Sequence, residues 1–441
     1  MAGLLLFTAL LSGCSTVTSG TTGTTTGPGP TGLAAQPENA KVALTWTAAA
    51  DATGYRIYRS TASGTTGSLV GSSSLASYTD TSAVNGTLYW YTVTSLTSAG
   101  ESSPSGALKA SPSLDRSGLA HGADISWTTW LEHNGVTWAD ASGTATAPEV
   151  LLANLGFDSV RLRVMVNPST STGVGYADSA SMVSAAQRFA AQGLSRVLVD
   201  FHLSDTWADP SHQAVPAAWA GHSAAQLATD VADHVTAVLT ALKTAGITPE
   251  WVQMGNEETQ GVLWPNLSKA SGTSATVWAP LVQVLNAGYD AVKAVDPSTK
   301  VILHLDRGAE SAISTWWFGA FKANGGKWDV VGLSFYPYWQ PNDTVAMLQA
   351  NMNTLVSTYG TPVMVVEVGG LETDVPGSQV ILSQVKNAVA SVPGNQGLGV
   401  FYWEPEGNAS VNGGYKLGAT SVLSGKALQF TQALEGLGYT P

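Results

Sequence analysis

From residue 118 onward, short apolar runs alternate with segments of helical periodicity. Continuous apolar runs of this length are typical of buried parallel strands. The predicted strands span residues 121–126, 159–165, 196–202, 250–256, 300–305, 329–336, 362–368 and 398–404. Helical periodicity is clear over 179–192 and 224–245, and a glycine follows each of these segments. Eight strand–helix units in succession predict a (β/α)8 TIM barrel over residues 118–441.

Residues 38–112 have a different pattern, in which apolar and polar residues alternate. The alternation is clear in 42–46, 55–59 and 88–93, and Asn85-Gly86 is a turn signal before the third run. Short strands at this spacing predict a small all-β sandwich. The segment resembles a fibronectin type III module through 44–46, 55–59, 78–80 and 99–102. We expect its tyrosines to pack in the core of that module rather than to bind carbohydrate.

The N-terminus has the features of an export signal followed by a tether. Residues 4–11 form an apolar run too short to span a bilayer, and Leu11-Ser12-Gly13-Cys14 follows the pattern of a bacterial lipoprotein signal. Lipidation would then occur at Cys14, although no Lys or Arg precedes the apolar run. The alternative is an ordinary secretory signal, and both readings predict an exported protein, either a cell-surface lipoprotein or extracellular. Residues 15–37 are rich in Ser, Thr, Gly and Pro, which predicts a flexible linker between signal peptide 1–14 and the sandwich.

Composition narrows the range of partners. Charged residues make up 11% of the 441 residues, against about 25% in an average protein. The net charge is -12 and the pI about 4.9, which argues against nucleic acid or an anionic membrane surface as a partner. Contact with a membrane is expected only through a lipid anchor. With one cysteine the chain has no internal disulfide, and we expect a monomer.

Two of the predicted strands end on a glutamate. The run from Trp251 leads to Asn256-Glu257, and the run from Val363 ends at Glu367. A single glutamate in such a position is often a solvated loop residue. In a β/α barrel, however, catalytic groups lie at the carboxyl ends of the strands, and a retaining glycosidase needs two carboxyl groups there.

Other polar and aromatic residues follow the remaining strands, so the same rim collects them. They are His121 to Asp124, Arg161, Arg163, Asp200 to His202, His304, Tyr336 and Trp403-Glu404. An Arg or Tyr beside a carboxylate favours its charged form, whereas burial and a nearby negative charge favour the neutral form. We assign Glu367 as the nucleophile, stabilised by Tyr336 and by one of the two arginines. Glu257 is assigned as the acid/base residue, and Asn256 as a ligand of the sugar 2-hydroxyl.

The motifs along residues 118–441 are specific in order and spacing. They are 122–126, 160–164, Val166-Asn167-Pro168, 200–210, Gly255-Asn256-Glu257, Leu263-Trp264-Pro265, 334–337 and 401–405. Together they resemble glycoside hydrolase family 53, the endo-β-1,4-galactanases. The resemblance implies a barrel, a retaining mechanism with Glu257 as acid/base and Glu367 as nucleophile, and β-1,4-galactan or type I arabinogalactan as substrate. The substrate-binding residues expected with it are Asp124, Arg161, Arg163, His202, Trp207, Asn256, His304, Tyr336 and Trp403.

The sequence departs from the family pattern at three places near the cleft. Val368-Gly369-Gly370-Leu371 replaces an aromatic-Pro pair, Leu203 replaces a tyrosine, and Gly407 replaces an aromatic residue. We therefore expect weaker distant subsites but the same reaction. No cofactor is expected. Some bacterial members of the family carry structural calcium, which leaves a calcium ion open, although no Asp-rich loop indicates one here.

Two kinds of alternative remain. His202, Asp205, Asp209 and His212 could be metal ligands, but they lack helical i, i+4 histidine spacing and an acidic triad. For Trp207, Trp264 and Trp403, ordinary packing competes with sugar stacking. The competing functions are a retaining barrel glycosidase for another β-glycan, such as mannan or glucan, and a non-catalytic surface glycan-binding protein.

Overall fold

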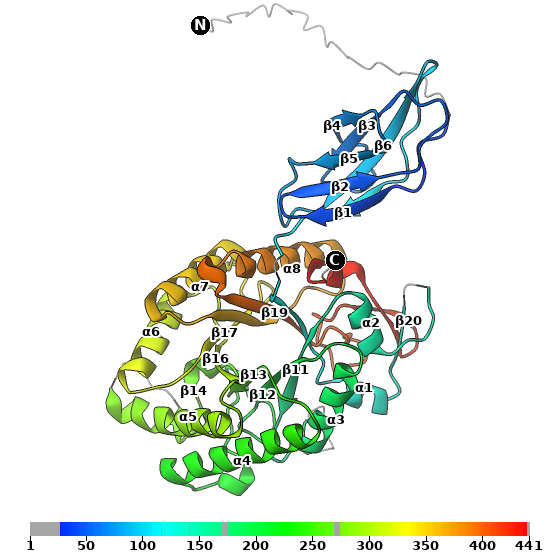
Figure 1. Cartoon of the computed structure of the whole chain (residues 1–441). Helices are drawn as coiled ribbons and strands as arrows, with labels where there is room; N and C mark the ends of the chain where they lie inside the picture. Colours follow the sequence, from blue (N-terminus) through cyan, green and yellow to red (C-terminus); the bar gives the residue numbers. More distant parts are fainter. Residues whose placement is uncertain (1–26, 116, 141, 170–174, 269–273, 439–441) are drawn as a thin grey trace, which may run out of the picture. The chain divides into compact units, whose positions relative to one another are not determined.

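The computed structural model describes residues 27–438 except 116, 141, 170–174 and 269–273. The expected signal peptide and Cys14 therefore lie outside the described residues. A region of β-strands comes first in the chain, and a barrel begins at Ala120 (Figure 1). The predicted fold class, a barrel preceded by an all-β region, is confirmed.

The first region consists of strands in two sheets. The strands are β1 (Ala34–Glu38), β2 (Lys41–Thr45), β3 (Gly54–Ser60), β4 (Ser68–Ser73), β5 (Ser77–Asp80), β6 (Tyr89–Thr97), β7 (Gly100–Glu101) and β8 (Leu108–Ala110). One sheet has the order β1-β2-β5; the other has the order β4-β3-β6-β7, with β8 also paired to β6. Tyr55, Tyr89 and Tyr91 are buried, and the Tyr89 hydroxyl accepts a hydrogen bond from the Val84 N–H at 3.2 Å. These tyrosines pack as the alternation predicted.

Eight parallel strands form the closed barrel. In chain order they are β9 (Ala120–Asp124), β11 (Ser159–Val164), β12 (Arg196–Phe201), β13 (Trp251–Met254), β16 (Lys300–Leu305), β17 (Val330–Phe335), β18 (Val363–Val368) and β19 (Gly397–Trp403). Each lies within one or two residues of its predicted range. The main difference is β13, which ends at Met254 because Gly255 turns the backbone at φ 88°. Asn256 and Glu257 consequently lie just beyond the strand.

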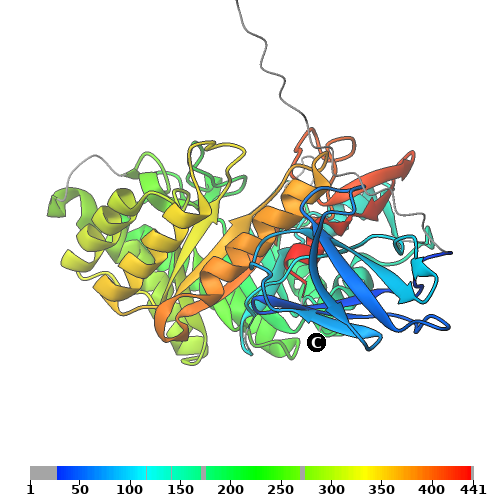
Figure 2. The ribbon, with the colours of Figure 1, turned by 90° about the horizontal axis from the view of Figure 1, so that it is seen from above.

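Helices and short elements connect the strands. They are α1 (Thr128–His133), α2 (Pro148–Asn154), α3 (Ser179–Ala190), α4 (Ala224–Thr244), α5 (Ala275–Val295), α6 (Ser311–Ala323), α7 (Val345–Tyr359), α8 (Val375–Ala390), β10 (Thr137–Ala139), β14 (Gly261–Val262), β15 (Leu267–Ser268), β20 (Thr420–Ser424), β21 (Ala427–Phe430) and the 3-10 turns η1 (Ala217–Trp219), η2 (Glu258–Gln260), η3 (Pro393–Asn395) and η4 (Gln432–Gly436). Figure 2 shows α6 to α8, in yellow and orange, side by side outside the strands. After β19 the described chain forms the β20–β21 hairpin and η4 in place of a long helix, since the segment between is rich in Gly and Asn.

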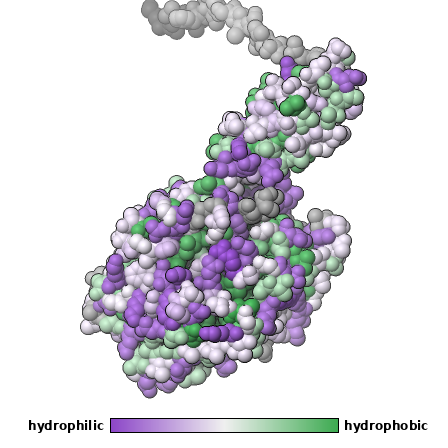
Figure 3. Space-filling model, in the orientation of Figure 1, coloured by the Kyte–Doolittle hydropathy of each residue, from purple (hydrophilic) through white to green (hydrophobic). Residues whose placement is uncertain are grey.

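Two apolar layers hold the barrel. The inner layer includes Trp251 and Phe401, whose rings meet edge to face with centroids 6.3 Å apart. Gly122 makes room for Phe401, because a Cβ there would lie 2.1 Å from its Cδ1. The outer layer, between strands and helices, is much larger. On the face seen in Figure 3, hydrophilic and hydrophobic residues are interspersed, and none of the described helices has the length and apolarity needed to cross a membrane.

His121 does not lie where the sequence placed it. Because β9 begins at Ala120, His121 is at the start of this strand and Asp124 at its carboxyl end. The His121 N–H donates to Asp158 Oδ1 at 3.0 Å, and its Nε2 lies 3.3 Å from Asp115 Oδ2. The expectation that His121 joins the polar rim was wrong, and Asp124 is the residue of this motif that reaches it.

The ring of His234 on α4 predicts acid sensitivity. It packs against Phe201 and Trp219, with centroids 5.5 and 6.2 Å away, and its Nε2 has no hydrogen-bond partner in the described part of the chain. Burial lowers the pKa of His234 from 6.5 to about 4. Below pH 6.5 the unfolded chain therefore binds more protons than the folded chain, and stability falls until pH 4. This group alone should cost up to about 3 kcal/mol over that interval.

We therefore expect His234→Gln to remove this part of the stability loss between pH 6.5 and 4. Urea unfolding at both pH values measures the difference. His133→Gln, at an exposed position on α1, is the matched control and should lose stability as the wild type does. Equal acid sensitivity of His234→Gln and wild type would contradict the assignment.

Candidate active site

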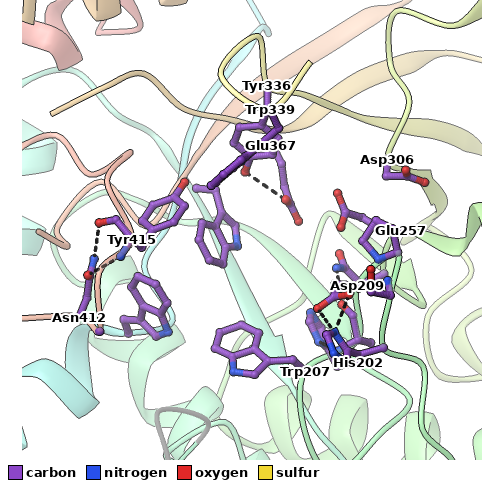
Figure 4. Close-up of a pocket in the computed structure, with 18 of the residues that line it drawn as sticks. His202, Trp207, Asp209, Glu257, Asp306, Tyr336, Trp339, Glu367, Asn412 and Tyr415 are labelled. Carbon is purple, nitrogen blue, oxygen red and sulfur yellow. Dashed lines mark hydrogen bonds and ion pairs between the residues drawn. The ribbon is translucent and has the colours of Figure 1, made fainter. Parts of the chain in front are cut away.

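The carboxyl ends of the barrel strands open into a pocket of about 780 Å³. Parallel strands bring their carboxyl ends to one side of the barrel, so residues far apart in sequence meet there. The residues that line the pocket are Trp127, Trp130, His202, Trp207, Ala208, Asp209, Pro210, Ser211, His212, Asn256, Glu257, Asp306, Tyr336, Trp339, Gln340, Glu367, Trp403, Asn412, Gly413 and Tyr415. Figure 4 shows most of these side chains.

Both predicted catalytic glutamates line this pocket. Glu367 is in β18 and is buried; its Oε2 accepts a hydrogen bond from the Tyr336 hydroxyl at 3.1 Å. Glu257 follows β13 in a left-handed conformation, φ 49° and ψ 57°, which turns the chain at the pocket wall. Its Oε1 accepts a hydrogen bond from the Ser334 hydroxyl at 2.7 Å. In Figure 4 the two side chains point toward the same part of the pocket.

Arg161 lies beneath the pocket and joins three carboxylates. Its Nη1 is 2.6 Å from Asp124 Oδ2, and its Nη2 is 2.9 Å from both Asp200 Oδ2 and Glu367 Oε1. Arg161 is fully buried, so these ion pairs are shielded from water. Arg163, the other candidate, instead pairs with Glu404 at 3.2 Å. Arg161 and Arg163 are two residues apart and lie on the same face of β11, so their different positions along the strand give Arg161, and not Arg163, the contact with Glu367.

The environments of the two glutamates separate their protonation. Burial raises the pKa of Glu367 to about 7, although Arg161 and the Tyr336 hydroxyl favour its charged form. Burial raises the pKa of Glu257 well above its usual range, and the charges of Glu367 and Asp306 raise it further. No ion pair to Glu257 is present among the described residues. Glu367 therefore loses its proton first, and Glu257 retains one.

A chain of hydrogen bonds fixes the orientation of Glu257. Two N–H donors, from Gln253 Nε2 at 3.1 Å and the Glu257 backbone at 3.3 Å, point at His304 Nδ1. Asn256 Oδ1 also lies 3.0 Å from Nδ1, but the Glu257 backbone N–H needs an acceptor there. Because Ser334 donates its own proton to Glu257, its Oγ can accept from His304 Nε2 at 2.8 Å, and we place the ring proton on Nε2. Ser334 in turn donates to Glu257 Oε1. Since Oε1 is an acceptor, a proton on Glu257 resides on Oε2.

The side chains of His202 and Asn256 are held by hydrogen bonds to residues that the sequence analysis did not predict as partners. His202 Nδ1 accepts from the Ala208 N–H at 3.0 Å, and Nε2 lies 3.0 Å from Asp200 Oδ2. Burial lowers the pKa of His202, so the ring is neutral with its proton on Nε2. Asn256 donates to the Ala208 carbonyl at 2.8 Å and accepts from Arg161 Nη2 at 2.8 Å. Both residues still border the pocket.

Trp127, Trp207, Trp403 and Tyr415 form one side of the pocket, here called the aromatic wall. Trp127 is in edge contact with Trp403 and Trp207, with centroids 5.0 and 6.1 Å apart, and Trp403 lies 4.7 Å from Tyr415. Of the tryptophans weighed in the sequence, Trp207 and Trp403 line the pocket and Trp264 does not. Trp127 is buried and the other three rings are half-buried, and aromatic faces that border a pocket in this way suit the C–H faces of sugars.

The predicted substrate-binding residues separate into two layers. His202, Trp207, Asn256, Tyr336 and Trp403 line the pocket. The other four do not line it: Arg161 and His304 contact Asn256, Arg163 contacts Trp207, and Asp124 pairs with Arg161. Their contribution to substrate binding remains a prediction. We expect these four residues to act indirectly, by holding the side chains that line the pocket.

The structure also adds pocket residues that sequence reasoning missed. Asp306 follows β16 immediately and is largely buried, so the strand-end rule could have found it. Trp127, Trp339, Asn412 and Tyr415 come from loops, whose paths have no periodic signal, and Trp130 comes from the short helix α1. Glu406, two residues beyond Glu404, is completely buried.

The positions that depart from the family pattern are filled by neighbours. A Cβ on Gly407 would lie 2.8 Å from Asn412 Nδ2, and one on Gly369 would lie 3.3 Å from the hydroxyl of Tyr415. Asn412 fixes this loop, because its Oδ1 accepts from the Tyr415 N–H at 3.1 Å. Leu203 is buried in the outer apolar layer. Tyr415 lines the pocket beside Gly369, and the weaker distant subsites expected from the missing aromatics remain a prediction.

The alternative metal site does not assemble. Asp205 accepts backbone hydrogen bonds from Asn167 and Ala217 at 3.0 and 2.8 Å, and Asp209 pairs with His212 at 2.8 Å. His202 is bonded to Asp200. Within the described ranges no three His, Cys, Asp or Glu side chains group in a way that could hold a metal ion.

Comparison with known proteins shows the family to which the chain is similar. The model of Glycosyl hydrolase family 53 matches residues 120–437. A probable arabinogalactan endo-β-1,4-galactanase A of Neosartorya fischeri is 34% identical over 319 residues, covering 66% of this chain and 86% of that protein. An arabinogalactan endo-β-1,4-galactanase of Thermothelomyces thermophilus is 31% identical over 339 residues, covering 72% and 97%. A solved structure of a fungal β-1,4-galactanase is 30% identical with a TM-score of 0.63, covering 72% of this chain and 98% of that one.

The bond from Tyr336 to Glu367 gives a test of the electrostatics. Removing this donor in Tyr336→Phe should destabilise the Glu367 carboxylate and raise its pKa above about 7. Titration of ¹³C-labelled glutamate side chains by NMR measures the change. Tyr338→Phe, at an exposed neighbouring ring, is the matched control and should leave the titration unaltered. An unchanged Glu367 titration in Tyr336→Phe would contradict the stabilising role.

Proposed function

The chain belongs to glycosyl hydrolase family 53, and from this membership we propose that its pocket cleaves β-1,4-galactosidic bonds within galactan or type I arabinogalactan. The observation that carries the proposal is the pair Glu257 and Glu367 in one pocket with opposite surroundings. Arg161 lies 2.9 Å from Glu367, whereas Ser334 alone donates to the carboxyl of Glu257 among the described residues. Retaining glycosidases need this asymmetry.

In the first step, Glu367 attacks the anomeric carbon while Glu257 donates its proton to the leaving glycosidic oxygen. The bond between the sugar and that oxygen breaks, and a glycosyl–Glu367 ester forms. The Tyr336 hydroxyl and Arg161 hold the Glu367 carboxylate by separate oxygens, at 3.1 and 2.9 Å. The proton of Glu257 leaves from Oε2, since Ser334 occupies Oε1.

In the second step, Glu257 removes a proton from water as the water oxygen attacks the same anomeric carbon. The ester bond breaks, the Glu367 carboxylate is regenerated, and Glu257 regains its proton. Two inversions leave the anomeric configuration unchanged. The neutral His304–Ser334 chain keeps Glu257 in one orientation through both steps.

The names of the relatives and the residues of the pocket both support galactan as the substrate. The relatives of Neosartorya fischeri and Thermothelomyces thermophilus are named arabinogalactan endo-β-1,4-galactanases. The aromatic wall can stack against sugar rings, and Asn256, whose amide carries a second N–H besides the one bonded to Ala208, can bind a sugar hydroxyl. His202 borders the pocket with both ring nitrogens bonded to the protein. The axial O4 of galactose bends a β-1,4 chain, so polar groups arranged for this shape would be left unpaired by cellulose or mannan.

We further propose roles for the parts of the chain outside the barrel domain 118–441. Residues 1–14 would direct export, with Cys14 as the site of lipidation. The tether at the cell surface would end before residue 34, because β1 begins at Ala34, inside the linker predicted over 15–37. Residues 38–112 would be a fibronectin type III-like spacer, supported by two sheets of short strands with buried tyrosines. A lipid anchor would be the only membrane contact, and the enzyme would act as a monomer without a cofactor.

The nucleophile assignment predicts that Glu367→Ala abolishes galactan hydrolysis, with kcat reduced on the order of 10⁴-fold or more. Azide should restore part of the turnover of an activated galactoside and yield an α-galactosyl azide, which NMR identifies. Glu310→Ala, a glutamate beyond β16 and outside the pocket, is the matched control and should remain active. Near-normal activity of Glu367→Ala would contradict the proposed mechanism, as would a first product of the wild type with inverted anomeric configuration.

The substrate assignment predicts that β-1,4-galactan is hydrolysed faster than mannan, xylan or cellulose. The difference in kcat/KM should be on the order of 10⁴-fold, because a wrong epimer leaves buried polar groups unpaired. Reducing-end assays on this panel measure it, and the oligosaccharide profile distinguishes internal from terminal cleavage. Faster hydrolysis of another β-glycan would favour the alternative glycosidase, and no hydrolysis of any would favour a glycan-binding protein.

A further inference from the structure

A second pair of glutamates lies behind the aromatic wall. Glu404 and Glu406, on either side of Pro405 at the end of β19, are both completely buried. The Glu404 backbone has φ 51°, a conformation that non-glycine residues seldom adopt, and its N–H donates to the Asp124 carbonyl at 2.9 Å. The proposed mechanism uses neither residue, which leaves two buried carboxyl groups to be explained.

Glu404 accepts hydrogen bonds on both oxygens. Oε1 lies 3.2 Å from Nη1 of the buried Arg163, and Oε2 accepts from the Trp127 backbone N–H at 2.9 Å. A carboxylate accepts on both oxygens, whereas a protonated carboxyl must donate from one. The donors around Glu404 therefore favour its charged form, with Arg163 as the counter-ion.

Glu406 has the complementary arrangement. Its Oε1 accepts from the Thr128 hydroxyl at 3.0 Å, and its carboxyl is hydrogen-bonded to that of Glu404. Within the described residues, no N–H or O–H donor reaches Oε2. Two carboxyl groups can hydrogen-bond only when one of them carries a proton, so the proton belongs to Glu406. Burial raises the pKa of both carboxyl groups, that of Glu406 to about 7 and that of Glu404 well above its usual range, so the pair retains a proton near neutral pH. The N–H donors at both oxygens of Glu404 are the reason to place that proton on Glu406.

With one shared proton the buried group is electrically neutral. Glu404 carries one negative charge, Arg163 one positive charge, and Glu406 none. This balance avoids the cost of an unpaired charge in a dry interior. Two ionised carboxylates facing Arg163 would leave one of them without a counter-ion.

The buried group formed by Arg163, Glu404 and Glu406 contacts the aromatic wall at two points. Glu404 holds Trp127 by its backbone, and the Arg163 guanidinium lies 4.3 Å from the ring centroid of Trp207. Cation–π contact of this kind orients the ring. Trp127 and Trp207 each have an edge contact with Trp403, so the three rings are positioned together.

We propose that Glu404 and Glu406 share one proton and, together with Arg163, fix the aromatic wall for sugar binding. Glu404 is then a positioning residue, which acts through Trp127 and Trp207 and does not itself touch substrate. This assignment rests on the proposed function only in so far as the wall binds galactan. The geometry of the wall is a property of the free protein.

The experiment compares Glu404→Gln, Glu406→Ala and Glu406→Gln in the full chain. Glutamine at 404 cannot neutralise Arg163, and alanine at 406 removes the proton donor to Glu404. Glutamine at 406 keeps an N–H that can replace the shared proton. We expect Glu404→Gln and Glu406→Ala to raise KM for galactan about ten-fold or more with a smaller change in kcat, and Glu406→Gln to recover most of the loss.

Near-ultraviolet circular dichroism of the free protein is the second readout, because closely packed indole rings give signals that depend on their geometry. The near-ultraviolet circular dichroism of the tryptophans in the aromatic wall should be weaker in Glu404→Gln and Glu406→Ala than in the wild type. In Glu406→Gln it should be close to that of the wild type. Wild-type spectra and KM in Glu404→Gln would overturn the proposal, as would equal damage in the two variants at 406. If Glu404→Gln does not fold, the comparison of Glu406→Ala with Glu406→Gln tests the proposal by itself. If the wild type does not cleave galactan, the spectra still test the wall.

Discussion

The guanidinium of Arg161 is the interaction on which the pocket depends. It lies 2.9 Å from Glu367 and 2.6 Å from Asp124, and it also pairs with Asp200. A cation at this place offsets the repulsion among the three carboxyl groups, which the low dielectric of the interior magnifies. Although burial opposes charge there, Arg161 and His202 lower the pKa of Asp200. The Arg161 cluster therefore fixes both the shape of the pocket floor and the charge that its nucleophile can carry.

Much of the barrel could be predicted from the sequence because buried parallel strands are continuously apolar. The eight predicted strands agree with the observed ones, and Glu257 and Glu367 were found because each ends such a run. The same rule applied to Asp306, which was overlooked. His121 was misplaced because it lies at the start of its strand, both as predicted and as observed, and only residues at the carboxyl end, such as Asp124, reach the rim. Tyr415 and Trp339 could not be predicted in this way, since loop paths depend on tertiary contacts rather than on periodicity.

Sequence departures from a family pattern need not be losses in space. Gly407 and Gly369 replace larger residues of the pattern, yet Asn412 and Tyr415 occupy the volume beside them. Tyr415 lies beside Gly369 and lines the pocket, so this side of the cleft has an aromatic ring although residues 368–371 contain none. The catalytic pair lies at the carboxyl ends of β13 and β18. This division is inherent in a barrel, because rigid strand ends hold the reacting groups and the loops that carry the rest of the site vary more freely.

The buried group behind the wall also has a consequence for how this site could change over generations or in the laboratory. Arg163, Glu404, Glu406 and Trp207 satisfy one another's charge, proton and stacking needs. Altering one of them removes the partner on which another depends, so the effects of single substitutions should not add. A library that varies these positions one at a time would find mostly defective enzymes. Varying them jointly gives access to combinations in which a different set of side chains is again self-consistent.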